Sequence, residues 1–311
     1  MKEDRLRPVK GDRMSLFKGI ITPMVTPFAH DERQTLNPEG AEKLIERLIT
    51  HGVHGIFTFG SYGESYSSTP DERIAFSEYT IKQVAGRVPV LVGTGSCSTW
   101  ETVEMSKRAE AIGADALAVI NPYGMKISDT MIATYYERVA SAVKIPVVVY
   151  NIPSSTQMNI SREVAEHVFS IDNVKGIKDS SGNMDNLAMY IEAAKGKDVD
   201  VLVGSDSKIL TALEMGAQGS VAATSNVITD TVVGIYEAWA AGDLETAAKL
   251  QADVDPLRDV IHLGVVPQGV KRSLELMGIP IGPGREPALE LSHEFDDQVR
   301  AMLDHYGIEH E

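Results

Sequence analysis

The stretch that decides the fold is Ile145-Pro146-Val147-Val148-Val149-Tyr150, an unbroken apolar run rich in β-branched residues. A second run, Val88-Pro89-Val90-Leu91-Val92, repeats the pattern of a proline at the entrance followed by valine-rich sequence. Continuous rather than alternating hydrophobicity indicates strands of a parallel sheet that is covered on both faces. Proline is tolerated at the entrance of such a strand. Both runs therefore predict buried parallel strands.

Eight runs of this kind recur along the chain and alternate with segments of helical pattern. They are Gly19–Met24, Gly55–Phe59, Val88–Gly93, Ala116–Ile120, Ile145–Tyr150, Val174–Lys178, Val201–Gly204 and Gly219–Ala222. The period is roughly 18 to 35 residues, as expected when each parallel strand needs its own crossover helix. Eight such units predict an α/β fold, a closed (β/α)8 TIM barrel. A doubly wound open sheet is the alternative, but the chain has no dinucleotide-binding glycine fingerprint.

The segments between and after the strands carry recognisable helix signals. Asn37-Pro38 predicts one helix start, while Thr69-Pro70-Asp71-Glu72 and Ser98-Thr99-Trp100-Glu101 both predict capping boxes. The helical stretches after the eighth strand exceed what a barrel of about 250 residues needs. They are Thr231–Ala241, Asp243–Leu263, Gln268–Met277 and Glu286–Tyr306. We therefore expect a charged N-terminal tail over residues 1–16, the barrel over 17–230 and a C-terminal helical extension over 231–311.

The composition narrows the classes of function. The 311 residues include 44 acidic and 29 basic ones, a formal net charge of −15, without a lysine and arginine cluster of the kind that phosphate contacts require. We expect no nucleic-acid partner. No apolar run approaches the ~20 residues of a membrane span, and the polar start Met1–Arg13 does not resemble a signal peptide. The single Cys97 leaves neither an internal disulfide nor a cysteine metal site, and the histidines show no metal-ligand spacing. These features favour a cytoplasmic protein without membrane contact.

Two of the predicted strands end on residues that could carry chemistry. Active sites of such barrels lie at the C-terminal ends of the strands. The fifth strand ends on Tyr150 and the sixth on Lys178, so the two side chains should be neighbours. A buried amine that is kept uncharged can attack a carbonyl and form an imine, and an adjacent phenol can move the protons. Taken singly, the lysine could instead pair with a barrel carboxylate or reach solvent, and the tyrosine could be a packed aromatic.

Two further loops at strand ends could bind a substrate. Gly60-Ser61-Tyr62-Gly63-Glu64 is typical of a tight turn whose backbone N–H groups face an anion such as a keto-acid carboxylate. Within it, Glu64 is expected to be a structural hydrogen-bonding carboxylate. Gly204-Ser205-Asp206-Ser207 could offer Gly204 and Asp206 to substrate hydroxyls, or it could be an ordinary helix N-cap.

With these residues identified, the chain resembles the dihydrodipicolinate synthase / N-acetylneuraminate lyase family. The resemblance runs from about Phe17 to the last helices and rests on several motifs that occur in the same order as in the family. These motifs are Gly19-Ile20-Ile21-Thr22-Pro23-Met24-Val25-Thr26-Pro27-Phe28, Gly60-Ser61-Tyr62-Gly63-Glu64, Gly93-Thr94-Gly95, Gly113-Ala114-Asp115, Asn121-Pro122-Tyr123, Tyr150-Asn151-Ile152-Pro153 and Gly176-Ile177-Lys178-Asp179.

The resemblance implies a role for each candidate residue. Lys178 would form the Schiff base with pyruvate or a 2-keto sugar acid, and Tyr150 would be the proton relay. The keto-acid carboxylate would lie against Ser61 and Tyr62, and Val221 would line the pyruvate site. The resemblance also implies a homotetramer, a dimer of tight dimers, and no cofactor or metal.

Three departures from the synthases of this family concern the second substrate. The synthases typically have a second threonine at the position of Tyr62. At the position of Gly124 they have a second tyrosine, which is reached from the partner subunit. They also have an arginine after the catalytic tyrosine, where this chain has Ser154-Ser155-Thr156. Uncharged hydroxyl groups such as that of Ser155 suit a sugar-like chain better than a charged amino acid.

We therefore expect a class I lyase that cleaves or forms a 2-keto-3-deoxy sugar acid, with pyruvate as the covalently bound component and an aldehyde as its partner. A keto-acid dehydratase or deaminase that uses the same imine is one alternative, and its product would retain all carbons. 4-Hydroxy-tetrahydrodipicolinate (dihydrodipicolinate) synthase is another, and turnover of pyruvate with aspartate semialdehyde would identify it. A keto-acid-binding barrel without catalysis is the last, recognised by binding without turnover.

Overall fold

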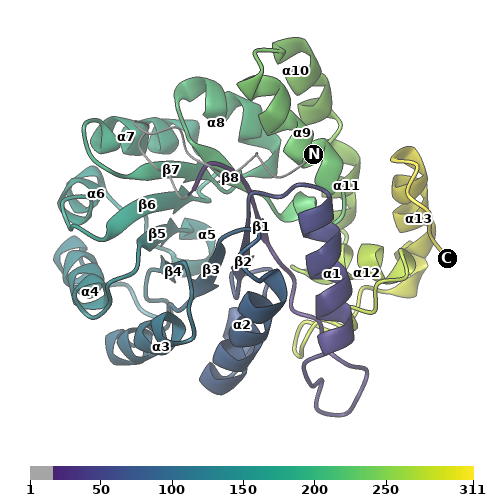
Figure 1. Ribbon diagram of the computed structural model, residues 1–311, viewed down its shortest axis with the longest axis horizontal. Helices are drawn as coiled ribbons and strands as arrows, with labels where there is room; N and C mark the ends of the chain where they lie inside the picture. Colours follow the sequence, from purple (N-terminus) through teal and green to yellow (C-terminus); the bar gives the residue numbers. More distant parts are fainter. Residues whose placement is uncertain (1–16) are drawn as a thin grey trace.

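The computed structural model describes residues 17–311, so the expected tail over residues 1–16 lies outside the described residues. Eight parallel strands close into a barrel in which β1 pairs with β8 and each other strand pairs with its neighbours in sequence (Figure 1). The strands are β1 Gly19–Pro23, β2 Gly55–Thr58, β3 Val90–Gly93, β4 Ala116–Ile120, β5 Val147–Asn151, β6 Val174–Asp179, β7 Asp200–Val203 and β8 Gly219–Val221. The predicted closed (β/α)8 barrel is confirmed, and the open-sheet alternative is wrong.

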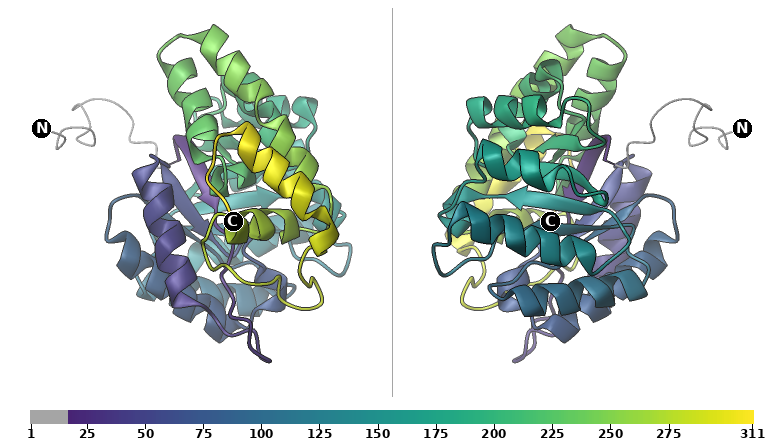
Figure 2. Two further views of the ribbon diagram at one scale, coloured as in Figure 1. Left: turned by 90° about the vertical axis from the view of Figure 1, so that its right-hand side faces the viewer. Right: turned by 90° about the vertical axis from the view of Figure 1, so that its left-hand side faces the viewer.

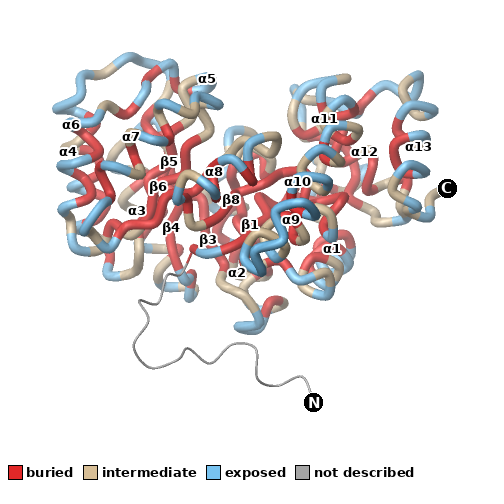
Figure 3. The backbone as a smooth tube through the Cα atoms, turned by 90° about the horizontal axis from the view of Figure 1, so that it is seen from above, coloured by how far each residue is buried: buried red, intermediate tan, exposed pale blue. Residues whose placement is uncertain are grey.

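Helices cover the outside of the barrel. The helices that follow the first seven strands are α1 Pro38–Thr50, α2 Pro70–Val84, α3 Thr99–Ala111, α4 Asp129–Ser141, α5 Pro153–Thr156, α6 Arg162–Val168, α7 Met184–Ala194 and α8 Ile209–Met215. The strands are buried while the helices keep their outer faces exposed (Figure 3). A separate apolar cluster fills the barrel interior, to which Phe57, Leu202 and Val221 belong. Because this interior is packed with side chains, a substrate can enter only at the mouth.

The predicted helix starts are largely present. Asn37 accepts hydrogen bonds from the backbone N–H groups of the first turn of α1, and Thr69 forms the predicted capping box of α2. The capping box predicted at Ser98 is incomplete. Ser98 does cap α3, but the carboxylate of Glu101 accepts from the Ser96 hydroxyl instead of returning to the cap residue. A nearby hydroxyl therefore competes with the backbone for that carboxylate.

The second strand ends one residue earlier than predicted, at Thr58, because of the loop that follows it. Phe59 has φ +55°, a left-handed conformation that cannot continue a strand. A Cβ atom at Gly63 would lie 2.6 Å from the backbone nitrogen of Phe59, so the loop folds tightly back onto its own start. The glycines of the 60–64 segment thus allow a sharp turn at the barrel mouth.

The helices after β8 differ from the prediction at two prolines. They are α9 Thr229–Ala240, α10 Leu244–Ala252, α11 Asp255–Ile261, α12 Gln268–Leu276 and α13 Asp296–His305. The helical stretch predicted over Asp243–Leu263 is divided into α10 and α11, because Pro256 lacks the N–H that a helix interior needs and instead lies in the first turn of a new helix, α11. The helix predicted over Glu286–Tyr306 is wrong in its first half, where Pro287 lies in an extended connection.

The last three helices, α11, α12 and α13, pack against one another at one side of the barrel (Figures 1 and 2). Four one-turn 3-10 helices complete the described elements: η1 Ser65–Ser67, η2 Asp206–Lys208, η3 Ala223–Asn226 and η4 His293–Phe295. Among residues 17–311, no helix is both long enough and apolar enough to span a membrane.

Candidate active site

Lys178 and Tyr150 lie side by side at the barrel mouth, at the ends of β6 and β5. They are register partners in the β5–β6 ladder. The Lys178 Nζ atom lies 4.0 Å from the centroid of the Tyr150 ring and 5.4 Å from that of the Phe57 ring. Only 6% of Lys178 is exposed. The structure therefore brings together an amine and a phenol between aromatic walls, with the amine accessible from the mouth.

The surroundings of Tyr150 adapt its phenol to proton transfer. Burial by itself raises the pKa of Tyr150, but the charge of Lys178 and a hydrogen bond with Ser61 outweigh it, so the pKa lies below the usual value for tyrosine. The Ser61 Oγ atom lies 3.4 Å from the Tyr150 hydroxyl oxygen. A phenol with a lowered pKa exchanges protons more readily with a substrate, because the best acid–base groups titrate near the working pH.

The loop that carries Ser61 is held from behind by a buried charge network. Glu64 has φ +55° and is fully buried, and its carboxylate lies 2.5 Å from the Lys271 Nζ atom. The second carboxylate oxygen accepts a hydrogen bond of 2.6 Å from the backbone N–H of Arg285. The structural role expected of Glu64 is confirmed. Through it, residues after β8 fix the conformation of the Ser61 loop.

Gly204 and Val221 lie close to the amine and leave it room. A Cβ atom at Gly204 would collide with the Ser180 hydroxyl and come within 2.9 Å of the Lys178 Cε atom, so a larger residue there would have to displace both side chains. Val221, at the end of β8, is 3% exposed and borders the same pocket. Gly204 and Val221 thus line the Lys178 pocket without adding a bulky polar side chain.

A pocket of ≈ 670 Å³ opens above Lys178 and collects most of the candidate residues. Ser61, Tyr62, Ser155, Gly204 and Val221 all line it. Tyr62 is half-buried, and burial together with the nearby Asp206 carboxylate raises the pKa of its phenol well above the usual value. Ser155, on the one-turn helix α5, is exposed at the rim. The pocket therefore combines one amine with a wall of hydroxyl groups.

Asp206 lies apart from this pocket. Its carboxylate accepts hydrogen bonds from the backbone N–H groups of Ala223 and Thr224, at 3.2 and 2.9 Å, and so holds the start of η3 against η2. Burial raises the pKa of Asp206, although these hydrogen bonds oppose the shift. It faces a neighbouring cavity of ≈ 300 Å³ instead. The ordinary N-cap expected of the 204–207 segment is not formed, because neither Ser205 nor Asp206 caps the helices that follow them, and Asp206 instead binds the first turn of a different helix, η3.

Several pocket residues were not predicted from the sequence. Ser180 lines the pocket and directly follows β6, so its position just beyond a strand end is the signal that could have identified it. His262 and Val266 line the mouth from the segment after α11, and the Tyr66 hydroxyl donates a 3.2 Å hydrogen bond to the Val266 carbonyl. The strand pattern contains no signal for these contributions from the C-terminal region.

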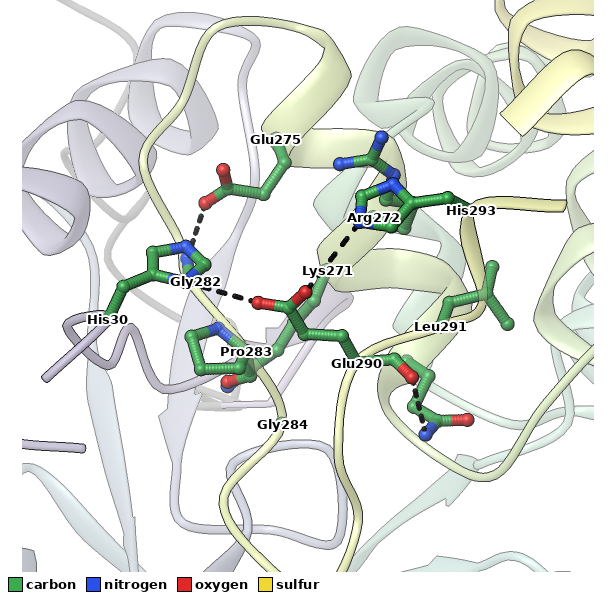
Figure 4. A pocket seen from close by; sticks show the side chains of 11 residues that line it. His30, Lys271, Arg272, Glu275, Gly282, Pro283, Gly284, Glu290, Leu291 and His293 are labelled. Atoms are coloured by element: carbon green, nitrogen blue, oxygen red, sulfur yellow. Dashed lines mark hydrogen bonds and ion pairs between the residues drawn. The ribbon is translucent and has the colours of Figure 1, made fainter. Parts of the chain in front are cut away.

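A separate cavity of ≈ 200 Å³ lies behind Lys271 and shares no lining residue with the Lys178 pocket (Figure 4). The charged groups of its lining have partners, and two of these partners lie outside the lining: Lys271 pairs with Glu64, and Arg272 pairs with Asp296. His30 lies 3.1 Å from Glu290, and Glu275 accepts from the backbone N–H of Gly282. Across the described part of the chain, no three histidine, cysteine, aspartate or glutamate side chains are arranged to hold a metal ion.

A lysine and a tyrosine side by side in the mouth of a parallel eight-stranded barrel define a class of protein, the class I aldolases and lyases. Comparisons with known proteins identify the family within that class. A model of the dihydrodipicolinate synthetase family matches residues 16–306. The chain belongs to this family, and it is a class I, lysine Schiff-base carbon–carbon lyase.

Individual relatives cover almost the whole chain. A 4-hydroxy-tetrahydrodipicolinate synthase from Methanoculleus marisnigri is 35% identical over 94% of this chain and 100% of its own. An uncharacterised DapA-like lyase from Halobacterium salinarum is 37% identical over 96% of this chain and 95% of its own. The crystal structure of YagE, a family member from E. coli K12 in complex with pyruvate, is 33% identical and superposes with a TM-score of 0.89, covering 94% and 99% of the two chains.

Proposed function

We propose that Lys178 forms an imine with the keto carbon of pyruvate and that the protein makes or breaks a carbon–carbon bond to an aldehyde. The observation that carries this proposal is the position of the Lys178 Nζ atom, 4.0 Å from the Tyr150 ring centroid in a buried pocket. The uncharged amine adds to the keto carbon and the carbinolamine loses water. Tyr150 supplies and removes the protons of these steps, a task that its lowered pKa supports.

The imine then acts as an electron sink. In its protonated form it withdraws electrons from the pyruvyl methyl group, which loses a proton to give an enamine. The enamine carbon attacks the aldehyde carbon, the aldehyde oxygen takes up a proton, and hydrolysis frees Lys178 and the product. Cleavage is the same sequence in reverse.

We propose that the carboxylate of pyruvate binds to the loop after β2. Within the described part of the chain, the backbone N–H groups of Ser61 and Tyr62 donate to no other acceptor, so both are available to an anion. The Val221 side chain borders the pyruvyl methyl group, and Gly204 leaves space for the imine.

Two activities, which differ in the aldehyde that they use, are candidates. The names of the curated relatives favour 4-hydroxy-tetrahydrodipicolinate synthase activity, with aspartate semialdehyde, over the sugar-acid lyase that we expected from the sequence. The second candidate, a 2-keto-3-deoxy sugar-acid lyase like the N-acetylneuraminate lyase branch, is favoured by the hydroxyl groups of Tyr62, Ser154 and Ser155 along the pocket. Synthase activity is therefore the first to be assayed.

The test begins with borohydride reduction in the presence of pyruvate, read by intact mass and peptide mapping. We expect one reduced pyruvyl adduct, on Lys178, which Lys178→Ala abolishes. Lys175→Ala is the matched control, because Lys175 lies on the same strand but forms an ion pair of 2.9 Å with Asp198. An adduct on a different lysine, or none, contradicts the proposal. Turnover is then compared between aspartate semialdehyde plus pyruvate and a 2-keto-3-deoxy sugar acid, and a product that keeps all its carbons identifies a dehydratase or deaminase.

We further propose a homotetramer built as a dimer of tight dimers, acting in the cytoplasm, which the family resemblance supports. We also propose that residues 17–230 form the catalytic barrel and residues 231–311 a C-terminal helical region. The helices α9 to α13 support that division. Sedimentation of the full chain measures the assembly directly.

A further inference from the structure

A second cavity adjoins the Lys178 pocket and is separated from it by Tyr62. It has a volume of ≈ 300 Å³ and shares four lining residues with the larger pocket, namely Tyr62, Gly204, Ala223 and His262. An acceptor aldehyde that reacts above Lys178 and extends past Tyr62 would therefore place its far end in this second cavity, which we call the annex.

The annex is cationic in a protein with a formal net charge of −15. Two cations, Arg258 on α11 and Lys208, line it, and the imidazole of His262 lies one turn beyond Arg258. The acidic group in the lining, Asp206, is already committed to the backbone N–H groups of Ala223 and Thr224. Local positive charge in an acidic molecule attracts anionic ligands selectively.

Arg258 has donors to spare. Its partner Asp255 lies 3.5 Å away on the same helix and is itself 67% exposed, while the Arg258 side chain is 33% exposed. The field of Arg258 extends to the wall between the two cavities. Burial raises the pKa of both the Tyr62 phenol and the Asp206 carboxyl, and the charge of Arg258 opposes both shifts. The guanidinium therefore lies close to the path between the pockets.

We propose that Arg258, assisted by His262, binds an anionic group at the far end of the acceptor aldehyde, either a carboxylate or a phosphate. This inference rests on the proposed function, because it takes Lys178 as the place where the aldehyde reacts. Ser154 and Ser155, which line the Lys178 pocket but not the annex, are uncharged, so the cation available to the acceptor comes from α11. A guanidinium suits this role because its planar donors match a carboxylate or a phosphate in two-point contact.

The test compares pairs of acceptors in which one member carries an anionic group and the other does not, using Arg258→Met and Arg258→Lys. The pairs are glyceraldehyde 3-phosphate with glyceraldehyde, and succinate semialdehyde with butanal, beside aspartate semialdehyde. We expect Arg258→Met to raise KM for the anionic members about 10- to 100-fold, which corresponds to the free energy of a lost charge-assisted hydrogen bond. The KM for the neutral members should change less than about twofold. Lysine should restore part of the loss. Arg108→Met is the matched control, because Arg108 is exposed on α3 and pairs with Asp71.

A binding measurement removes any dependence on turnover. The borohydride-reduced pyruvyl enzyme is titrated calorimetrically with each aldehyde pair, and the anionic member should bind more weakly to Arg258→Met than to the wild type by the same factor. Equal effects on both members of a pair, no effect, or a wild-type preference for neutral acceptors overturns the role of Arg258. Absence of any pyruvyl adduct in the wild type is a different result, because it contradicts the proposed imine itself.

Discussion

Replacing Lys271 by methionine should destabilise the protein strongly, because it leaves a buried carboxylate without its counter-ion. Lys271 is 2% exposed and Glu64 is fully buried, with 2.5 Å between their charged atoms. Burial lowers the pKa of Lys271 and raises that of Glu64, and the charge of each partner opposes the shift of the other. Removing one partner of a buried ion pair costs about 3–5 kcal/mol, because the remaining charge has lost its compensation.

The lost hydrogen bond from the Lys271 Nζ atom to the Pro283 carbonyl, of 2.6 Å, adds to that loss. A net hydrogen bond contributes about 1 kcal/mol, so the total loss is about 4–6 kcal/mol. That is a large share of the roughly 5–15 kcal/mol by which folded domains are typically stable. Equilibrium urea denaturation at pH 7, with circular dichroism and fluorescence as probes, measures it as a lower midpoint with an unchanged slope.

Two further variants decide whether the pair is responsible. Lys271→Met combined with Glu64→Gln should be more stable than Lys271→Met alone, because no buried charge remains unpaired. Lys249→Met should change stability by less than about 0.5 kcal/mol, since its 2.7 Å ion pair with Glu245 is exposed. A loss below about 1 kcal/mol in Lys271→Met, or a double variant as unstable as the sum of the singles, would refute the reasoning.

Three other outcomes follow from the geometry of the site. Gly204→Ala should abolish borohydride trapping while leaving the fold intact by circular dichroism, because the added Cβ atom would come within 2.9 Å of the Lys178 Cε atom; trapping at the wild-type rate contradicts this. Tyr150→Phe should lower kcat about 10²- to 10⁴-fold, the usual contribution of general acid–base catalysis. It should also remove the change in kcat below pH 10 that titration of Tyr150, with its lowered pKa, produces in the wild type. An unchanged pH–rate profile excludes the relay role. The hydrogen bonds from Arg285 lower the pKa of Glu72 to about 2, below its ordinary value of 4.5. This pair therefore stabilises the fold above pH 4.5, and its contribution disappears as the pH falls towards 2. Arg285→Met should flatten the acid dependence of the unfolding free energy in urea titrations, and an equal dependence in both proteins contradicts the assignment.

The catalytic pair could be found from the sequence because it depends on local rules alone. Parallel strands in sequential order bring the last residues of neighbouring strands together, so Tyr150 and Lys178 had to be adjacent once β5 and β6 were identified. The Ser61 loop could be found for a similar reason, since Gly60 and Gly63 allow a turn that larger residues would obstruct. In each case the signal lies within a few residues of a strand end.

The partners of Glu64 could not be found in this way. Lys271 and Arg285 lie more than two hundred positions further along the chain, and nothing in their immediate sequence distinguishes them from surface cations. The same holds for Arg258. The sequence predicts a helical stretch over 243–263, and the structure shows that it divides near Pro256 into α10 and α11, whose Arg258 lines the annex.

The region after β8 therefore contributes to the site in two physically different ways. Lys271 and Arg285 hold Glu64 from behind and so determine where Ser61 meets Tyr150, which concerns the pyruvate step. Arg258 borders the annex and concerns the acceptor step. The two contributions can be separated by mutation. Substitution of Lys271 or Arg285 should alter imine formation whichever acceptor is used, whereas substitution of Arg258 should alter only the reaction with charged acceptors. On this proposal the choice of aldehyde depends on α11 and the imine chemistry depends on the strands, so the residues at the strand ends indicate pyruvate but not its partner.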